Sequence, residues 1–295
     1  MGVGTGYPPR ARTERSAAAR AAGGARRTLP GVPPAASSTI AVGGRRLECQ
    51  DLPGDPARPP VVLLHEGLGS VGLWRGLPET LAGATGCRTV AFSRFGHGAS
   101  DPPPEPRTPR FMHEEALAVL PAVLDALDLR APVLVGHSDG ASIALIHAAE
   151  RPVRGLVAIA PHVFVEEVTL RGIRAARAAF ADGGLRERMA RHHRDPDVAF
   201  RNWCDVWLDP AFRAWSIEDR LPSITAPLLL VQGDRDEYGS LAQLDAIERG
   251  AAGPVERLVV PGGHSPHLER PDGVVPAIVR FVARAGTAGE PAAAG

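Results

Sequence analysis

The chain has 295 residues, enough for one large α/β domain or two smaller ones, and 44% of them are hydrophobic, which is ample for a core. Its 33 basic and 33 acidic residues balance, so charge gives no reason to expect a nucleic acid or an anionic membrane as a partner. The three scattered cysteines favour reduced thiols in a cytoplasmic protein, and no apolar run approaches the length of a membrane span.

Residues 1–38 differ in composition from the rest of the chain. They contain six arginines against one acid, Glu14, among many Ala, Gly and Pro residues, and they lack the apolar core of a secretory signal. We expect a disordered extension here and a frayed tail over residues 287–295. The domain itself is predicted to span residues 39–286.

Regular elements follow in an alternating order. Residues 39–49 are typical of a β-hairpin with a glycine turn. Buried strands are predicted at 61–65, 88–92, 132–137, 153–160, 227–232 and 255–260, and helices near 74–82, 112–127, 140–149, 241–248 and 274–283. Strands that alternate with helices in this way predict an α/β fold, with a mostly parallel sheet covered by helices on both faces.

The alternation stops at residues 162–222. This segment has a helical pattern and holds three of the four tryptophans, Trp203, Trp207 and Trp215. A helical insertion at this point predicts a cap over the carboxyl edge of the sheet, with Trp203 and Trp207 as candidate substrate contacts. The alternative is a helical decoration with an ordinary core of its own.

The clearest chemical motif is Gly136-His137-Ser138-Asp139-Gly140. It follows a predicted strand and precedes an Ala-rich helix, the context that a nucleophile elbow requires. The helix N-terminus would also favour an oxyanion beside Ser138. The motif therefore predicts Ser138 as a nucleophile; the alternative is a tight turn in which the serine only caps the helix.

A serine nucleophile needs a base and an acid, and loops after two later strands supply both. Asp234 and Asp236 follow the strand that ends at residue 232, and His264 follows the strand that ends at residue 260, with His267 nearby. Because the carboxyl ends of parallel strands meet at one edge, we expect the acid and the base beside Ser138. We favour Asp236 over Asp234, which could bond within its own loop, and His264 over His267.

Taken together, these motifs resemble the α/β-hydrolase family over residues 39 to about 283. The resemblance implies an eight-stranded α/β-hydrolase sheet, a Ser138–His264–Asp236 triad and a helical cap inserted after the sixth strand. It also implies an oxyanion hole that uses the N–H of Asp139 and one N–H of the loop after the strand at 61–65. Gly67 is our choice for that loop donor, and Leu68 is the alternative.

Two positions depart from the family pattern. Glu66 stands where a glycine usually follows His65, and its carboxylate could face the pocket or bond within its own loop. Ser93 stands where an acidic residue is common, which we interpret as structural. The loop at 94–100 is similar to the Gly-x-Gly-x-Ser loop of the family. Glu66, Arg94 and His137 join the two tryptophans as candidate substrate contacts.

We therefore predict a serine hydrolase that cleaves a small-molecule carboxylic ester without a cofactor or metal. A carbon–carbon bond hydrolase of ring-cleavage products would use the same triad. Two alternatives belong to other classes. The stretch 67–72 matches the G-x-G-x-x-G dinucleotide motif, and Arg94 would suit a 2′-phosphate, which would indicate an NADP-dependent oxidoreductase. A non-catalytic, ligand-binding member of the same fold is the other.

Overall fold

The computed structural model describes residues 37–285. The predicted N-terminal extension therefore lies almost entirely outside the described residues, and the predicted tail lies wholly outside them. One boundary needs correction: the first strand begins at Ser38 rather than at residue 39, because Ser38 already pairs with Cys49 across the hairpin.

The described strands form a single eight-stranded sheet in the order β1-β2-β4-β3-β5-β6-β7-β8. Only the pairs β1–β2 and β2–β4 are antiparallel, so the predicted mostly parallel sheet is confirmed. The strands are β1 (Ser38–Val42), β2 (Arg45–Leu52), β3 (Val61–Leu64), β4 (Thr89–Phe92), β5 (Val133–His137), β6 (Gly155–Ile159), β7 (Leu228–Gly233) and β8 (Val255–Val260).

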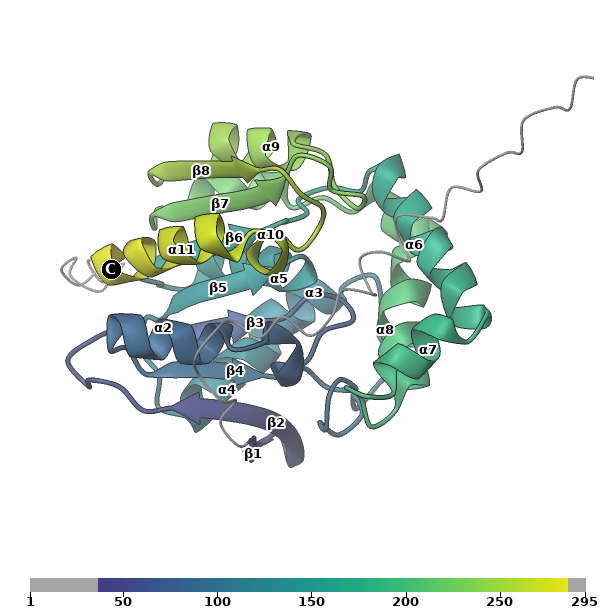
Figure 1. Cartoon of the computed structure of the whole chain (residues 1–295), viewed down its shortest axis with the longest axis horizontal. Helices are drawn as coiled ribbons and strands as arrows, with labels where there is room; N and C mark the ends of the chain where they lie inside the picture. Colours follow the sequence, from purple (N-terminus) through teal and green to yellow (C-terminus); the bar gives the residue numbers. More distant parts are fainter. Residues whose placement is uncertain (1–36, 286–295) are drawn as a thin grey trace, which may run out of the picture.

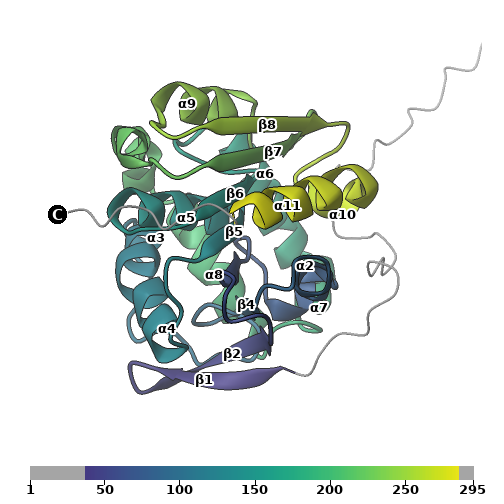
Figure 2. The ribbon, with the colours of Figure 1, turned by 90° about the vertical axis from the view of Figure 1, so that its left-hand side faces the viewer.

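Helices cover both faces of this sheet (Figures 1 and 2). In chain order the helical elements are η1 (Val71–Trp74), α2 (Leu77–Thr85), α3 (Phe111–Glu114), the π-helical turn η2 (Glu115–Val119), α4 (Leu120–Ala126), α5 (Asp139–Glu150), α6 (Glu167–Ala181), α7 (Gly184–Met189), α8 (Pro196–Trp207), η3 (Pro210–Ala214), η4 (Glu218–Ser223), α9 (Ala242–Gly250), α10 (Pro266–Glu269) and α11 (Pro271–Ala285). Of these helices in residues 37–285, none is both long and apolar enough to span a membrane.

The two faces of the sheet carry separate hydrophobic cores. Successive side chains of a strand point to opposite faces, so Val61 and Leu63 pack under α2 and α11, whereas Val62 and Leu64 join the core beneath α3, α4 and α5. All four side chains are at most 1% exposed. Burial on both faces explains why the central strands are continuous apolar runs rather than alternating ones.

The helix predicted near 112–127 is divided by η2. The π-helical turn comes just before Pro121, which has no N–H for an i→i−4 bond and whose ring would crowd the carbonyl of Leu117. A proline in this register explains why one uniform α-helix does not form.

The segment between β6 and β7 contains α6, α7, α8, η3 and η4, and we call it the cap segment. Figure 1 shows α6, α7 and α8 beside the ends of the parallel strands. Apart from an isolated bridge between Phe164 and Ser216, its described elements are helical, as predicted. Trp207 and Phe212 are almost completely buried, and they join the core of one sheet face through contacts with Asp139 of α5 and Phe111 of α3, so the segment shares a core with the sheet.

Candidate active site

Ser138 lies in a strained turn between β5 and α5. Its φ of 53° and ψ of −120° fall outside the regions that most residues adopt, and such conformations gather at functional sites. A Cβ at position 140 would collide with the carbonyl of Leu64, and one at 136 would collide with the backbone of Ala141. Both glycines of the motif are therefore required for the turn to pack against the sheet.

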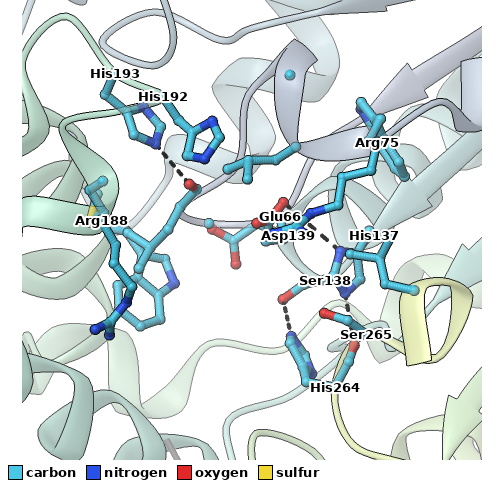
Figure 3. A pocket seen from close by; sticks show the side chains of 18 of the residues that line it. Glu66, Arg75, His137, Ser138, Asp139, Arg188, His192, His193, His264 and Ser265 are labelled. Carbon is cyan, nitrogen blue, oxygen red and sulfur yellow. Dashed lines mark hydrogen bonds and ion pairs between the residues drawn. The ribbon is translucent and has the colours of Figure 1, made fainter. Parts of the chain in front are cut away.

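His264 joins Ser138 to Asp236. The His264 Nε2 atom lies 2.9 Å from the Ser138 Oγ, and its Nδ1 lies 2.8 and 2.9 Å from the two carboxylate oxygens of Asp236 (Figure 3 shows the bond to Ser138). Asp236 also accepts a 2.8 Å hydrogen bond from the N–H of Tyr238. The ring therefore donates through Nδ1 and accepts the serine proton through Nε2.

His264 and Asp236 shift each other's pKa. Burial alone would lower the pKa of His264, but the charge and hydrogen bond of Asp236 outweigh burial and raise this pKa above 6.5. Burial would likewise raise the pKa of Asp236, but the charge and hydrogen bond of His264 lower it below the ordinary range. The carboxylate is thus charged at neutral pH, where it favours a proton on His264.

Asp234 and His267, the alternatives to Asp236 and His264, have other partners. Asp234 accepts a 3.0 Å hydrogen bond from the N–H of Gly262 and so ties the β7 loop to the β8 loop. His267 is buried with its ring 4.8 Å from that of His137 and 5.6 Å from that of Trp74, and burial lowers its pKa to about 3. Neither residue takes part in the Ser138–His264–Asp236 chain of hydrogen bonds.

The loop after β3, residues 65–68, faces Ser138, and we call it the oxyanion loop. Its successive carbonyls are bound by side chains from other segments. Arg94 donates to the carbonyl of His65 and, at 3.1 Å, to that of Glu66; His97 Nε2 lies 2.9 Å from the carbonyl of Gly67. The backbone of this loop is thereby fixed from behind.

His193, from the cap segment, binds the next carbonyl. Its Nδ1 accepts a 3.0 Å hydrogen bond from the N–H of Gly98, so its Nε2 carries the proton and donates to the carbonyl of Leu68 at 2.9 Å. Burial lowers the pKa of His193 to about 4, which keeps the ring neutral. The cap segment and the oxyanion loop are therefore directly linked.

These bonds orient the N–H groups of the loop. The C=O and N–H of a trans peptide point in opposite directions, so the N–H of Gly67 points away from Arg94 and that of Leu68 away from His97. Within residues 37–285, neither N–H bonds to a backbone carbonyl, nor does that of Asp139 at the start of α5. The ring of Trp203 lies so close to Gly67 that a Cβ there would collide with it.

A cavity of about 550 Å³ opens over Ser138, within the size range of small-molecule sites. The cap segment contributes an apolar wall that includes Ile173, Ala176, Met189 and Trp203. Of the candidate substrate contacts, Glu66, His137, Trp203 and Trp207 line the cavity.

Arg94 does not line the cavity, and its prediction as a substrate contact was wrong. The side chain is 1% exposed because it lies behind the oxyanion loop, where the carbonyls of His65 and Glu66 hold it.

Sequence reasoning also missed His193 and Glu237. Glu237 lines the cavity beside the triad, and burial raises the pKa of its carboxyl. Its position directly after Asp236 was the one available signal.

The glycines at 67–72 do not form a dinucleotide site of the usual kind. Gly67 lies in the oxyanion loop, Gly69 directly after it and Gly72 in the 3₁₀ turn η1, and the first α-helix after β3 begins only at Leu77. A pyrophosphate would find no α-helix N-terminus at these glycines. In residues 37–285 no cluster of His, Cys, Asp and Glu side chains is suited to hold a metal ion.

Known proteins resemble this chain in sequence. A model of the alpha/beta hydrolase family matches residues 61–277. The mouse protein named sn-1-specific diacylglycerol lipase ABHD11 is 34% identical over 101 residues, a stretch that covers 34% of this chain and only 31% of the lipase.

Solved structures share the fold at low identity. A bacterial membrane phospholipase A superposes with a TM-score of 0.69 and 19% identity, covering 86% of this chain and 87% of the other. The enol-lactonase from Burkholderia xenovorans LB400 superposes with a TM-score of 0.67 and 19% identity, covering 83% of this chain and 99% of the lactonase.

Proposed function

The chain belongs to the alpha/beta hydrolase family, and from this premise we propose that it is a serine hydrolase that cleaves a small-molecule carboxylic ester. The observation that carries the proposal is the unbroken chain of hydrogen bonds from Ser138 through His264 to Asp236 at the wall of a large cavity. The names of its relatives, a lipase, a phospholipase and a lactonase, are those of ester-cleaving enzymes and support the same reaction class.

The geometry supports a two-step acyl transfer. Ser138 Oγ attacks the ester carbonyl while His264 Nε2 takes its proton, and the same proton then passes to the departing alcohol. A water molecule, activated by His264, attacks the acyl-enzyme and releases the acid. Asp236 holds the Nδ1–H tautomer of His264 and stabilises the imidazolium that forms in each step.

Each tetrahedral intermediate carries a negative oxygen that needs donors. We propose the N–H of Asp139 and that of Gly67, with Leu68 as the alternative loop donor. Asp139 begins the 12-residue helix α5, whose N-terminus favours an anion. The carbonyl bonds made by Arg94 and His97 turn the loop N–H groups away from those side chains, which supports this assignment.

A serine-directed fluorophosphonate tests the activated nucleophile. We expect the intact mass of the wild type to rise by a single adduct and that of Ser138→Ala to stay unchanged. Ser265→Ala is the matched control, because Ser265 also lines the cavity, and it should still be labelled. A folded wild type without an adduct, or a labelled Ser138→Ala, would contradict the proposal.

A substrate panel then separates the reactions that this triad can support. We expect turnover of carboxylic esters above that of a thioester or a vinylogous diketone of matched size. Turnover of the diketone alone would replace the esterase by a carbon–carbon bond hydrolase on the same three residues.

A further inference from the structure

Glu66 faces the catalytic cavity. It lies in the oxyanion loop, next to Gly67, and lines the cavity together with Ser138 (Figure 3). Its side chain is 28% exposed, so part of it is accessible from the cavity. The carboxyl also lies against its own loop, since a Cβ at position 69 would collide with Glu66 Oε2, so it combines the two arrangements that the sequence left open.

The neighbouring His137 gives Glu66 no proton. His137 Nδ1 lies 3.9 Å from Glu66 Oε2, while His137 Nε2 lies 2.8 Å from the carbonyl oxygen of His264. Since a carbonyl only accepts, Nε2 carries the hydrogen. Burial and the neighbouring His267 and His264 lower the pKa of His137 well below 6.5, so the ring is neutral and Nδ1 presents a lone pair.

Two arginines lie near this carboxyl. Arg94 donates to the carbonyls of His65 and Glu66 and is almost fully buried behind the loop. Arg75 lines the cavity and is drawn on the side of Glu66 in Figure 3. Among residues 37–285, no arginine lies within ion-pair distance of the Glu66 carboxyl; burial raises the pKa of this carboxyl, and a hydrogen bond from its own backbone N–H opposes that shift. A carboxyl at the wall of the cavity thus keeps acceptor capacity that the protein does not use.

Two further carboxyls, those of Asp139 and Glu237, lie at this end of the cavity, and burial raises the pKa of both. Asp139 accepts a 3.1 Å hydrogen bond from Trp207 Nε1 through one oxygen, and its buried second oxygen has no partner among the described residues. Glu237 lines the same end, beside His264. In Figure 3 the labelled arginine of the cap segment, Arg188, lies across the cavity from Ser138.

We propose that Glu66 is a specificity-determining residue that accepts a hydrogen bond from an ammonium or hydroxyl group of the substrate, close to the scissile carbonyl. The position follows from the neighbouring Gly67, the proposed donor to that carbonyl, so this inference rests on the proposed hydrolase function. An anionic substituent at the same place is disfavoured, because it would meet the Glu66 carboxylate.

Two series of esters test the proposal on the whole chain. The acyl series is benzyl propionate, benzyl lactate and benzyl alaninate, which present a hydrogen, a hydroxyl and an ammonium on the α-carbon. The alcohol series is propyl and 2-hydroxyethyl phenylacetate. We expect Glu66→Gln to lower kcat/KM for the donor-bearing esters of at least one series by about 10- to 100-fold, with little change for benzyl propionate or propyl phenylacetate.

The two donor types respond differently to the amide. The side-chain carbonyl introduced by Glu66→Gln accepts only a neutral hydrogen bond, which is weaker than one to a carboxylate, so a hydroxyl ester should lose about 10-fold, whereas an ammonium also loses the attraction of the charge and should lose about 100-fold. A larger loss for the alaninate than for the lactate therefore identifies an ammonium as the preferred group, and equal losses identify a hydroxyl.

Glu237→Gln is the matched control, because it removes another carboxyl from the same cavity. If Glu237→Gln lost as much donor preference as Glu66→Gln, the effect would come from the overall charge of the cavity, and the proposal would be overturned. Unchanged kcat/KM ratios in Glu66→Gln, or an equal loss for every ester, would overturn it as well.

The failure of this inference is distinguishable from that of the proposed function. If benzyl propionate is hydrolysed and the serine is labelled, but Glu66→Gln leaves the preference unchanged, only the role of Glu66 is wrong. If no ester is hydrolysed and no fluorophosphonate adduct forms, the hydrolase proposal fails and the role of Glu66 fails with it.

Discussion

The two sides of Ser138 are held in place in different ways. On the triad side, Asp236 and His264 occupy the loops after β7 and β8, and they bond to each other and to local backbone. On the oxyanion side, the carbonyls of residues 65–68 are bound by side chains from the loop after β4 and from the cap segment.

This difference distinguishes residues that are positioned by the sheet from residues that are also positioned by the cap segment. Neighbouring parallel strands bring the triad loops together, so the triad needs no residue of the cap segment for its hydrogen bonds. The loop that carries Asp236 also contacts the cap segment, since Thr169 donates to the carbonyl of Tyr238 and Ser240 donates to Glu166. In the oxyanion loop, however, a cap side chain, that of His193, binds a carbonyl of the proposed donor loop itself. Substitutions on the two sides should therefore have distinguishable effects.

The largest effect is expected on the triad side, from Asp236→Asn. The amide would favour the wrong tautomer of His264, and loss of the carboxylate charge would destabilise the imidazolium, so kcat should fall by about 10³- to 10⁴-fold. Steady-state kinetics on the preferred ester measure the loss.

Asp234→Asn is the matched control for that substitution. Its carboxylate bonds the N–H of Gly262 and not His264, so kcat should change by less than about 10-fold. A comparable loss in both variants would contradict the assignment of Asp236 and the view that the two loops have separate tasks.

The triad side was predictable because its groups lie on local motifs at the ends of strands. Ser138 follows β5, and Asp236 and His264 lie in the loops after β7 and β8, where the topology of a parallel sheet brings them to one edge. The fold was predictable for a related reason, since buried parallel strands appear as apolar runs that alternate with helices. The choice between Asp234 and Asp236 was harder, because both follow one strand and only the folded loops separate them.

The oxyanion side was not predictable in the same way. His193 binds the carbonyl of Leu68, 125 residues earlier in the chain, and nothing local to either residue indicates this contact. Arg94, a candidate substrate contact from the sequence, lies in the loop after β4, and its position there does not show which way the side chain turns. Its actual partners are backbone carbonyls, which carry no sequence signal.

A smaller loss is expected from Arg94→Met. The carbonyl of His65 would lose its donor and that of Glu66 one of its donors, so the loop would no longer hold its N–H groups in one orientation. We expect kcat to fall by about 10- to 100-fold with little change in KM, the pattern for a group that acts in the transition state.

Thermal unfolding of Arg94→Met must accompany the kinetics, because a buried cation is being removed. An unchanged kcat in the folded variant would mean that the loop keeps its orientation without this side chain, and would weaken the contrast between the two sides.

A smaller loss of kcat than in Arg94→Met is expected from His193→Leu, which removes the hydrogen bond between the cap segment and the oxyanion loop. Leucine cannot donate to Leu68 or accept from Gly98, and we expect a loss in kcat of about 10-fold, as for one hydrogen bond. His193→Gln keeps a donor and an acceptor and should restore most of the rate. Equal losses in the two variants would indicate a packing role instead.

The smallest effect is a shift in pH dependence, measured as the midpoint of the kcat/KM profile. His264 must be neutral to accept the serine proton, so kcat/KM should rise with pH through its pKa, which Asp236 raises above 6.5 despite burial. In Asp236→Asn the charge of Asp236, the largest raising cause, is gone while burial remains and Glu237 and Glu66 alone oppose it, so the midpoint should move to lower pH. His193→Gln should leave the midpoint unchanged, because burial lowers the pKa of His193 to about 4 and its ring is neutral across this range.

The carboxyl of Glu66 also has a pKa raised by burial, and the pH profile of Glu66→Gln on benzyl propionate shows whether this carboxyl contributes to the midpoint. A midpoint that moves in His193→Gln as far as in Asp236→Asn would mean that both sides act through His264, and the distinction between them would be lost.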